Sequence, residues 1–258
     1  MENYSDYSKK QKGIILPFFE YCISKKIRIP WSNSKRLAKY FCNSFGHFQF
    51  NGKKLLDIGG GNGLYTKCFA LLGADKPICM EPESEGSNTK MLEEMEVISQ
   101  YKPEKIFLNC KDSVQNYKIE EHGQFDIVVM NNSINHLEED ATIAMLEDPL
   151  SYERVKKALT NVVNLSKDHG IIIASDCGRK NISSIFGIKN PCAPTIEWHK
   201  HQEPHVWVEM FNEIASFKPT TKWNPNLRFG VLAELTRLAP IRFIVGSHFT
   251  LYLEKQQS

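Results

Sequence analysis

The feature that most constrains the fold is an alternation of short apolar segments with longer amphipathic segments over most of the 258 residues. Each apolar segment has the length of a strand and is mostly apolar, which is typical of a strand buried on both faces. Five segments are therefore expected to be strands: residues 53–59, 77–81, 105–110, 125–131 and 170–176. The segments between them have helical spacing. The alternation predicts an α/β fold, a doubly wound and mostly parallel sheet covered by helices on both faces.

The two ends of the chain depart from this alternation. Residues 1–50 contain aromatic-rich helical patterns without a strand, which predicts an N-terminal helical cap beside a main domain of residues 51–258. We expect most of the aromatic side chains of the cap to form its packing core. Residues 177–205 form a long segment rich in His and Trp directly after a predicted strand, and such segments often shape binding sites. A helix over 206–217, a strand near Trp223 and a final strand over 248–255 are expected to complete the fold.

Charge and cysteine content exclude several classes of function. The 32 basic and 30 acidic residues nearly balance, so no nucleic acid or anionic membrane is expected as a partner. The seven cysteines are odd in number and include no C-x-x-C pair, which indicates reduced thiols and neither disulfides nor zinc. No apolar segment approaches the ~20 residues that span a bilayer, and the N-terminus lacks a signal peptide. We expect a cytoplasmic protein, and nothing in the sequence indicates its oligomeric state.

The sequence LLDIGGGNGLYT, residues 55–66, joins the first predicted strand to a helix through a glycine-rich loop. Glycines stand at positions 59, 60, 61 and 63, where they permit positive φ and close approach to the backbone. The backbone N–H groups at the start of the helix then point toward whatever lies over the loop. Such loops bind NAD, FAD or S-adenosylmethionine, or serve only as turns, so the motif needs support from other residues.

Polar residues follow each of the next three predicted strands. Glu81 stands twenty residues after Gly61, where a carboxylate can accept hydrogen bonds from the ribose hydroxyls of an adenosine. Asp112 follows the third strand, where its carboxylate can accept from the adenine amine, and Asn131 ends the fourth. Because the carboxyl ends of parallel strands meet at one edge of a sheet, these residues predict a ligand crevice there.

As a set, these motifs resemble those of class I S-adenosylmethionine-dependent methyltransferases. The matching parts are the glycine loop, Glu81, Asp112, the segment FDIVVMNNSINHLEE and the segment ALTNVVNLSKDHGIIIASD, within residues 50–176, together with the terminal HFTLYLEK. The resemblance implies a Rossmann-like sheet of seven strands with one antiparallel strand. It also implies that S-adenosyl-L-methionine is bound by these residues: Asp57, Gly59, Gly60, Gly61, Asn62, Gly63, Glu81, Pro82, Asp112, Ser113 and Asn131.

Two departures from common motifs matter for this interpretation. The loop does not keep the G-x-G-x-x-G spacing of a dinucleotide site, because position 64 is Leu, and this disfavours a nicotinamide oxidoreductase. The turn before the fifth predicted strand reads KDHG, where the family often has a proline and two glycines.

Histidines supply the candidate catalytic groups. Transfer of a methyl group to a hydroxyl requires alignment and removal of a proton, and His136 follows the fourth strand with an intrinsic pKa near working pH. The alternative is a histidine that only hydrogen-bonds at the start of a helix. In an extended segment, His199 and His201 would face the same side. With Glu203 they could then ligate a metal, but we favour contacts with acceptor oxygens and expect no metal.

Trp198 and His205 are expected to contribute to substrate binding from the same segment. The histidines favour a small-molecule O-methyltransferase, because a hydroxyl acceptor needs a base. The segment after residue 177 also resembles enzymes of bacterial surface-polysaccharide biosynthesis that methylate sugars, nucleotide-linked intermediates or phosphoramidates. The alternatives are an N-methyltransferase, for which alignment alone suffices, and a non-catalytic subunit that binds the cofactor.

Overall fold

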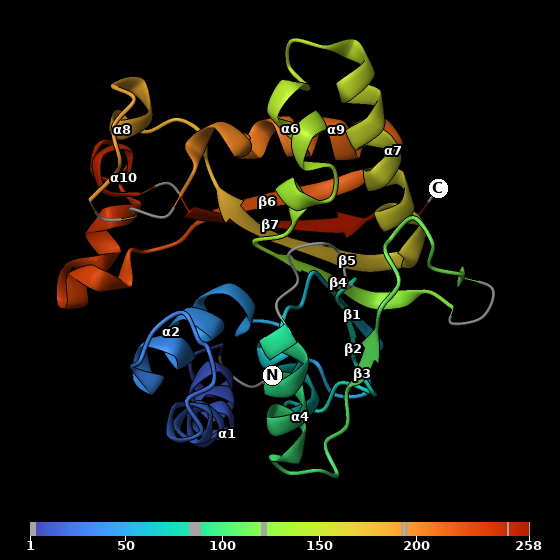
Figure 1. Ribbon diagram of the computed structural model, residues 1–258, viewed down its shortest axis with the longest axis vertical. Coiled ribbons are helices and arrows are strands. Elements are labelled where there is room, and N and C mark those ends of the chain that lie inside the picture. Colours follow the sequence, from blue (N-terminus) through green and yellow to red (C-terminus); the bar gives the residue numbers. More distant parts are fainter. Residues whose placement is uncertain are drawn as a thin grey trace. The chain divides into compact units, whose positions relative to one another are not determined.

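The computed structural model describes residues 4–82, 89–119, 123–191, 193, 196–246 and 248–257, and shows an α/β fold (Figure 1). Its strands are β1 (Leu55–Ile58), β2 (Ile78–Met80), β3 (Leu108–Cys110), β4 (Phe125–Asn131), β5 (Ser166–Cys177), β6 (Phe217–Trp223) and β7 (His248–Lys255). Its α-helices are α1 (Tyr4–Ser24), α2 (Ser34–Phe45), α3 (Leu64–Leu71), α4 (Thr89–Gln100), α6 (Glu139–Ala144), α7 (Pro149–Leu165), α8 (Ile182–Ile185), α9 (Pro204–Ile214) and α10 (Ala239–Val245). Three 3-10 helices are η1 (Ile134–His136), η2 (Trp198–Lys200) and η3 (Leu227–Arg237).

The strands form one seven-stranded sheet in the order β3-β2-β1-β4-β5-β7-β6. Strand β1 pairs in parallel with β2 and with β4, whereas β7 runs antiparallel to both of its neighbours. A single reversed strand near one edge of a mostly parallel sheet is the topology that the sequence predicts. The KDHG segment, residues 167–170, differs from the prediction of a turn before the fifth strand. It falls within β5, which begins at Ser166, and its bend is taken up at His169, whose φ is 58°.

The described chain divides into two compact units. The first contains residues 1–117 and 125–129, and the second contains residues 118–124 and 130–258. The predicted boundary between a cap and a main domain near residue 50 stays a prediction. None of the helices within the described ranges is both long and apolar enough to cross a membrane.

The first unit has an aromatic core. Phe41, Phe45 and Phe50 surround Phe69 of α3, with ring centroids 5.0–5.4 Å apart. Phe18 of α1 is fully buried and packs against Tyr101 at 5.3 Å. The prediction that aromatic residues of the N-terminal helices form a packing core is confirmed for Phe18 and Phe19, which are fully buried, whereas Tyr21 and Trp31 are only partly buried. Burial of the aromatic core fixes α1 and α2 against α3, the helix that follows the glycine loop.

The second unit packs helices against its own strands. Helices α6, α7 and α9 lie together beside β5, β6 and β7 in Figure 1. Trp207 and Phe211 of α9 are fully buried, as is Leu253 of β7. The Nζ of Lys255, at the end of β7, donates to the carbonyl oxygens of Val163 and Ser166 at 3.4 and 3.0 Å. These contacts connect the end of β7 to the end of α7 and the start of β5.

Candidate functional site

The glycine loop lies in the first unit between the end of β1 and the start of α3. Gly59, Gly61 and Gly63 have φ angles of 68°, 57° and 77°, in the left-handed region that favours glycine. The N–H of Gly59 donates to the carbonyl oxygen of Met80 at 2.8 Å, so the loop leaves the sheet while still bonded to β2. The turn is therefore sharp, and it presents the backbone at the start of α3.

Two glycines of the loop are also required by the packing of the protein itself. A Cβ on Gly60 would lie 2.6 Å from Cys79 Sγ and 3.1 Å from Asp57 Oδ2. A Cβ on Gly63 would lie 2.8 Å from the ring of Phe107. Real Cβ atoms do not approach other atoms this closely, so neither position has space for a side chain. The sequence indicates close approach to this backbone, and at these positions the approaching groups are side chains of the same chain.

Glu81 lies directly beside the loop. Its Oε2 accepts a hydrogen bond from the Gly61 N–H at 2.8 Å, and its own N–H donates to the carbonyl oxygen of Cys110 at 2.9 Å. Pro82 follows it and is partly exposed. The structure thus brings together Glu81 and Gly61, which the sequence pairs by their spacing of twenty residues.

Asp57 lies beneath the loop and is 1 % exposed. Its Oδ2 accepts a hydrogen bond from Thr66 Oγ1 at 2.6 Å, which ties β1 to α3. Burial raises the pKa of Asp57 to about 7, although the Thr66 hydrogen bond opposes the shift, and the nearby Glu81 carboxylate adds to it. Asp57 therefore holds the loop from below.

Asn62 has a structural role at the tip of the loop. Its Nδ2 donates to the carbonyl oxygen of Arg28 at 3.0 Å and to Glu94 Oε2 at 2.9 Å. These bonds connect the loop to the segment after α1 and to α4, and the sequence gives no sign of them. A contact between Asn62 and the cofactor stays a prediction.

Asp112 and Ser113 follow β3 in the same unit. Asp112 is exposed, and its Oδ2 accepts from the Cys110 thiol at 3.8 Å, while Ser113 is partly buried. Their contact with an adenine stays a prediction, as does that of Asn131, which ends β4 in the second unit.

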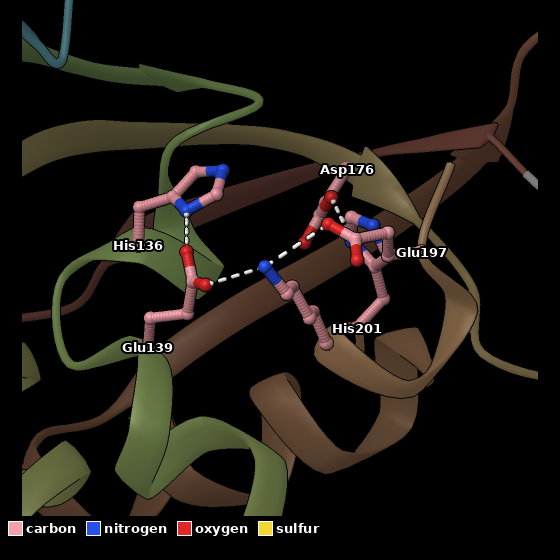
Figure 2. A network of polar contacts seen from close by, with 6 residues as sticks. His136, Glu139, Asp176, Glu197 and His201 are labelled. Carbon is pink, nitrogen blue, oxygen red and sulfur yellow. Dashed lines mark hydrogen bonds and ion pairs between the residues drawn. The ribbon is translucent and has the colours of Figure 1, made fainter. Parts of the chain in front are cut away.

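The second unit contains two histidine–carboxylate pairs, both drawn in Figure 2. In the first, His136 Nδ1 lies 2.5 Å from Glu139 Oε2, and the His136 side chain is 54 % exposed. Lys200 Nζ contacts Glu139 at 2.7 Å and Glu197 at 3.0 Å, which joins the segment after β4 to η2. The Lys200 hydrogen bond lowers the pKa of Glu139, and that of His136 adds to the effect. This pair is part of a solvent-accessible ionic network.

The second pair is buried and joins distant parts of the sequence. Asp176, at the end of β5, is 1 % exposed, and its Oδ1 lies 2.8 Å from His201 Nδ1. The same oxygen accepts from the Cys177 N–H at 2.7 Å. A carboxylate offers only acceptors, so Nδ1 carries the proton, and in the neutral form of the His201 ring Nε2 is an acceptor. Asp176 Oδ2 has no hydrogen-bond partner within the described ranges.

His248 lies close to this buried pair. Its Nε2 is 2.8 Å from Asn132 Oδ1, and its Nδ1 is 3.1 Å from Asn224 Nδ2, an arrangement that suits a neutral imidazole. Burial lowers the pKa of His248 to about 4, with Asp176 opposing this shift and His201 adding to it. Sequence reasoning missed both His248 and Asp176. Asp176 left one signal, a carboxylate at the end of a predicted strand directly before the His-rich segment.

The predicted extended conformation of the His-rich segment is wrong. Residues 198–200 form the 3-10 helix η2, so the same-side arrangement that an extended segment would give His199 and His201 does not apply. His201 pairs with Asp176, whereas His199 and Trp198 line a pocket beside α8. His205 is exposed on α9 and is not among the residues lining that pocket.

Residues 192, 194 and 195 of the His-rich segment lie outside the described residues. The described ranges contain no group of three or more His, Cys, Asp or Glu side chains that could hold a metal ion.

Comparison with protein-family models finds no match, and comparison with curated protein sequences finds none either. Solved structures do match. An S-adenosylmethionine-dependent methyltransferase from Archaeoglobus fulgidus aligns with a TM-score of 0.54 and 13% identity over 85% of this chain and 94% of that one. Phosphoethanolamine N-methyltransferase 2 of Haemonchus contortus, in complex with S-adenosyl-L-methionine, aligns with a TM-score of 0.56 and 12% identity over 100% of this chain and 61% of that one. The [4+2]-cyclase SpnF aligns with a TM-score of 0.53 and 12% identity over 96% of both chains.

The chain shares their fold. Because the identities are low, the likeness extends to the fold alone, and the function has to be argued from the residues of the site.

Proposed function

We propose that the protein is an S-adenosylmethionine-dependent methyltransferase. The observation that carries the proposal is the contact between the Glu81 carboxylate and the Gly61 N–H at 2.8 Å. It brings an acid that can accept ribose hydroxyls to a loop whose backbone can approach a ligand. The fold supports this choice, since one protein that shares it was solved in complex with S-adenosyl-L-methionine.

The residues of the first unit suit a cofactor that contains adenosine and no phosphate. Glu81 would accept from the ribose hydroxyls and Asp112 from the adenine amine, and the backbone over residues 59–63 would hold the rest of the cofactor. Asp57 and Thr66 would keep the loop rigid from below. The spacing of the glycines does not form a pyrophosphate cradle, which disfavours a dinucleotide. When bound, S-adenosylmethionine supplies an electrophilic methyl group on a sulfonium.

The second unit supports a hydroxyl acceptor. Because Asp176 holds the proton on Nδ1 of His201, Nε2 of the neutral ring would accept the proton that a hydroxyl acceptor loses on methylation. His136 is a second candidate base, but it is more exposed and belongs to the ionic network. We therefore assign the acceptor base to His201. That the acceptor is a sugar, nucleotide-linked or phosphoramidate intermediate of surface-polysaccharide biosynthesis is a finer proposal, which rests on the resemblance alone.

Binding of S-adenosylhomocysteine tests the cofactor assignment. Isothermal titration of the ligand-free protein should give micromolar affinity, and NAD should not bind. Glu81→Ala should weaken binding by roughly 30-fold, because a hydrogen bond to a charged group is worth about 2 kcal/mol. Glu96→Ala, an exposed acid on α4, is the matched control and should bind as the wild type does.

Two results of the titration would contradict the proposal. One is the absence of binding by folded wild-type protein, and the other is equal weakening by the two variants. A positive result justifies an acceptor screen that follows methyl transfer from labelled cofactor. Comparing matched hydroxyl and amine acceptors in that screen separates O-methylation from N-methylation.

A further inference from the structure

A pocket of about 590 Å³ lies beside α8 in the second unit. Its walls come from two segments, residues 179–189 and residues 196–199. This volume falls in the range of about 300–1,000 Å³ that is typical of small-molecule sites. The pocket therefore has room for a metabolite.

The charges that line this pocket are predominantly positive. Arg179, Lys180 and Lys189 line it, and none of them forms an ion pair with another residue in the described ranges. The one acidic side chain in the lining, Glu197, is already paired with Lys200 at 3.0 Å. Three cations without an internal counter-ion create an attractive site for an anion.

The remaining walls combine apolar and polar groups. Ile185 and Ile188 are 66 % and 59 % exposed, and Trp198 supplies an aromatic wall that is 7 % exposed. Ser183, which is 3 % exposed, adds a hydroxyl that can donate to an oxyanion. Exposed isoleucines beside unpaired cations suit a ligand with one charged end and one apolar part.

Part of the pocket wall belongs to the segment that carries the proposed base. Trp198 and His199 of η2 line it, and the chain passes directly from η2 to His201, which pairs with Asp176. A ligand held against η2 would touch the segment that positions His201.

We propose that this pocket binds the methyl acceptor, and that the acceptor is an anion with an apolar part, either a phosphate monoester or a carboxylate. Arg179, Lys180 and Lys189 pair with the oxyanion, and Ile185, Ile188 and Trp198 pack against the apolar part. The identification of the ligand as the acceptor rests on the proposed function, whereas binding of the anion does not.

Titration with three model compounds of similar size tests this inference. Phenyl phosphate and benzoate carry the two candidate anions, and benzyl alcohol is the neutral control. We expect the wild type to bind at least one of the two anions more tightly than the alcohol, and the preferred anion indicates the source of the charge. Arg179→Gln and Lys189→Gln should each weaken binding of that anion about five- to tenfold and leave alcohol binding unchanged. Lys157→Gln, an exposed lysine on α7 outside the pocket, is the matched control and should have no effect.

Titration of the same protein samples with S-adenosylhomocysteine separates the two proposals. Cofactor binding without anion binding would overturn the pocket assignment and leave the proposed function intact. Anion binding without cofactor binding would retain the pocket and overturn the proposed function. Equal weakening by Lys157→Gln and Lys189→Gln would also overturn the assignment, because it would indicate a general effect of net charge.

Discussion

The glycine loop and the His201–Asp176 pair are built in different ways. The loop is a backbone structure, and the atoms that hold it come from β1, β2, the start of α3, α4 and the segment after α1. The pair is a side-chain structure, and its members are 25 residues apart in the sequence. Substitutions in the loop are expected to change its backbone conformation. A single isosteric substitution in the pair, by contrast, is expected to remove its side-chain chemistry and leave the fold unchanged. Each prediction below tests this difference.

The largest effect is expected at the buried pair. His201→Gln should lower the turnover of a hydroxyl acceptor by about 10²–10⁴-fold, the usual contribution of a positioned base. Asp176→Asn should lower it about tenfold to 100-fold, because the imidazole loses the group that fixes its tautomer. Steady-state rates should show the loss in kcat, while KM and the affinity for S-adenosylhomocysteine remain those of the wild type.

His169→Asn, at an exposed position near the start of β5, is the control for these substitutions and should leave the rate unchanged. A wild-type rate in His201→Gln would remove this residue from the chemistry and leave His136 as the candidate base. A loss of cofactor affinity in either variant would show that the His201–Asp176 pair also supports the fold.

The second effect concerns the loop. Gly60→Ala should destabilise the protein by about 1–3 kcal/mol, the usual cost of overpacking, because its Cβ would meet Cys79 Sγ. Adding Cys79→Ala removes that sulfur and should recover part of the loss. Urea unfolding of the two single variants and the double variant measures this coupling. If Cys79→Ala does not relieve the defect, packing of Cys79 is not the reason for glycine at position 60.

The third effect is a pH dependence of opposite sign in the two units. The pKa of His248 is about 4, below its usual 6.5, so between these values the unfolded chain binds a proton that the folded chain does not. Through His248, stability falls as the pH drops from 6.5 to 4. The pKa of Asp57 is about 7, above its usual 3.8, so there the folded chain holds the additional proton. Through Asp57, stability falls as the pH rises from 3.8 to 7.

Because the two trends oppose each other, single substitutions should separate them. In Asp57→Asn, the free energy of unfolding should rise by about 1–2 kcal/mol from pH 4.5 to 6.5, because the opposing effect of Asp57 is gone and that of His248 remains. His248→Gln should produce the reverse trend, of similar size. Free energies of unfolding from urea titrations at three pH values test both, and equal slopes in the two variants would contradict the assignment.

The same contrast explains what could be predicted from the sequence. The five strands before residue 180 were predictable because each is a short, mostly apolar segment between helical patterns. The expectation that each is buried on both faces is wrong for β3, where Leu108 and Asn109 are exposed. The contact between Glu81 and Gly61 was predictable because neighbouring parallel strands bring their carboxyl ends together.

Asp176, His248 and η2 were not predictable in the same way. Their roles depend on which distant side chains meet, and a pattern of alternating residues cannot encode that. The expectation that His199 and His201 share a face depended on an extended segment, and the chain forms the 3-10 helix η2 there instead.

The packing of Cys79 and Phe107 against the loop has a consequence for descent. Selection for a stable fold alone would keep glycine at positions 60 and 63, because any other residue collides with these side chains. Under the proposed function, a descendant that had lost cofactor binding would therefore still carry the same glycines, whereas Glu81 would keep its hydrogen bond from the Gly61 N–H but lose its contact with the ribose. In related chains, an acid after β2 is therefore better evidence of the proposed cofactor binding than the glycines before α3.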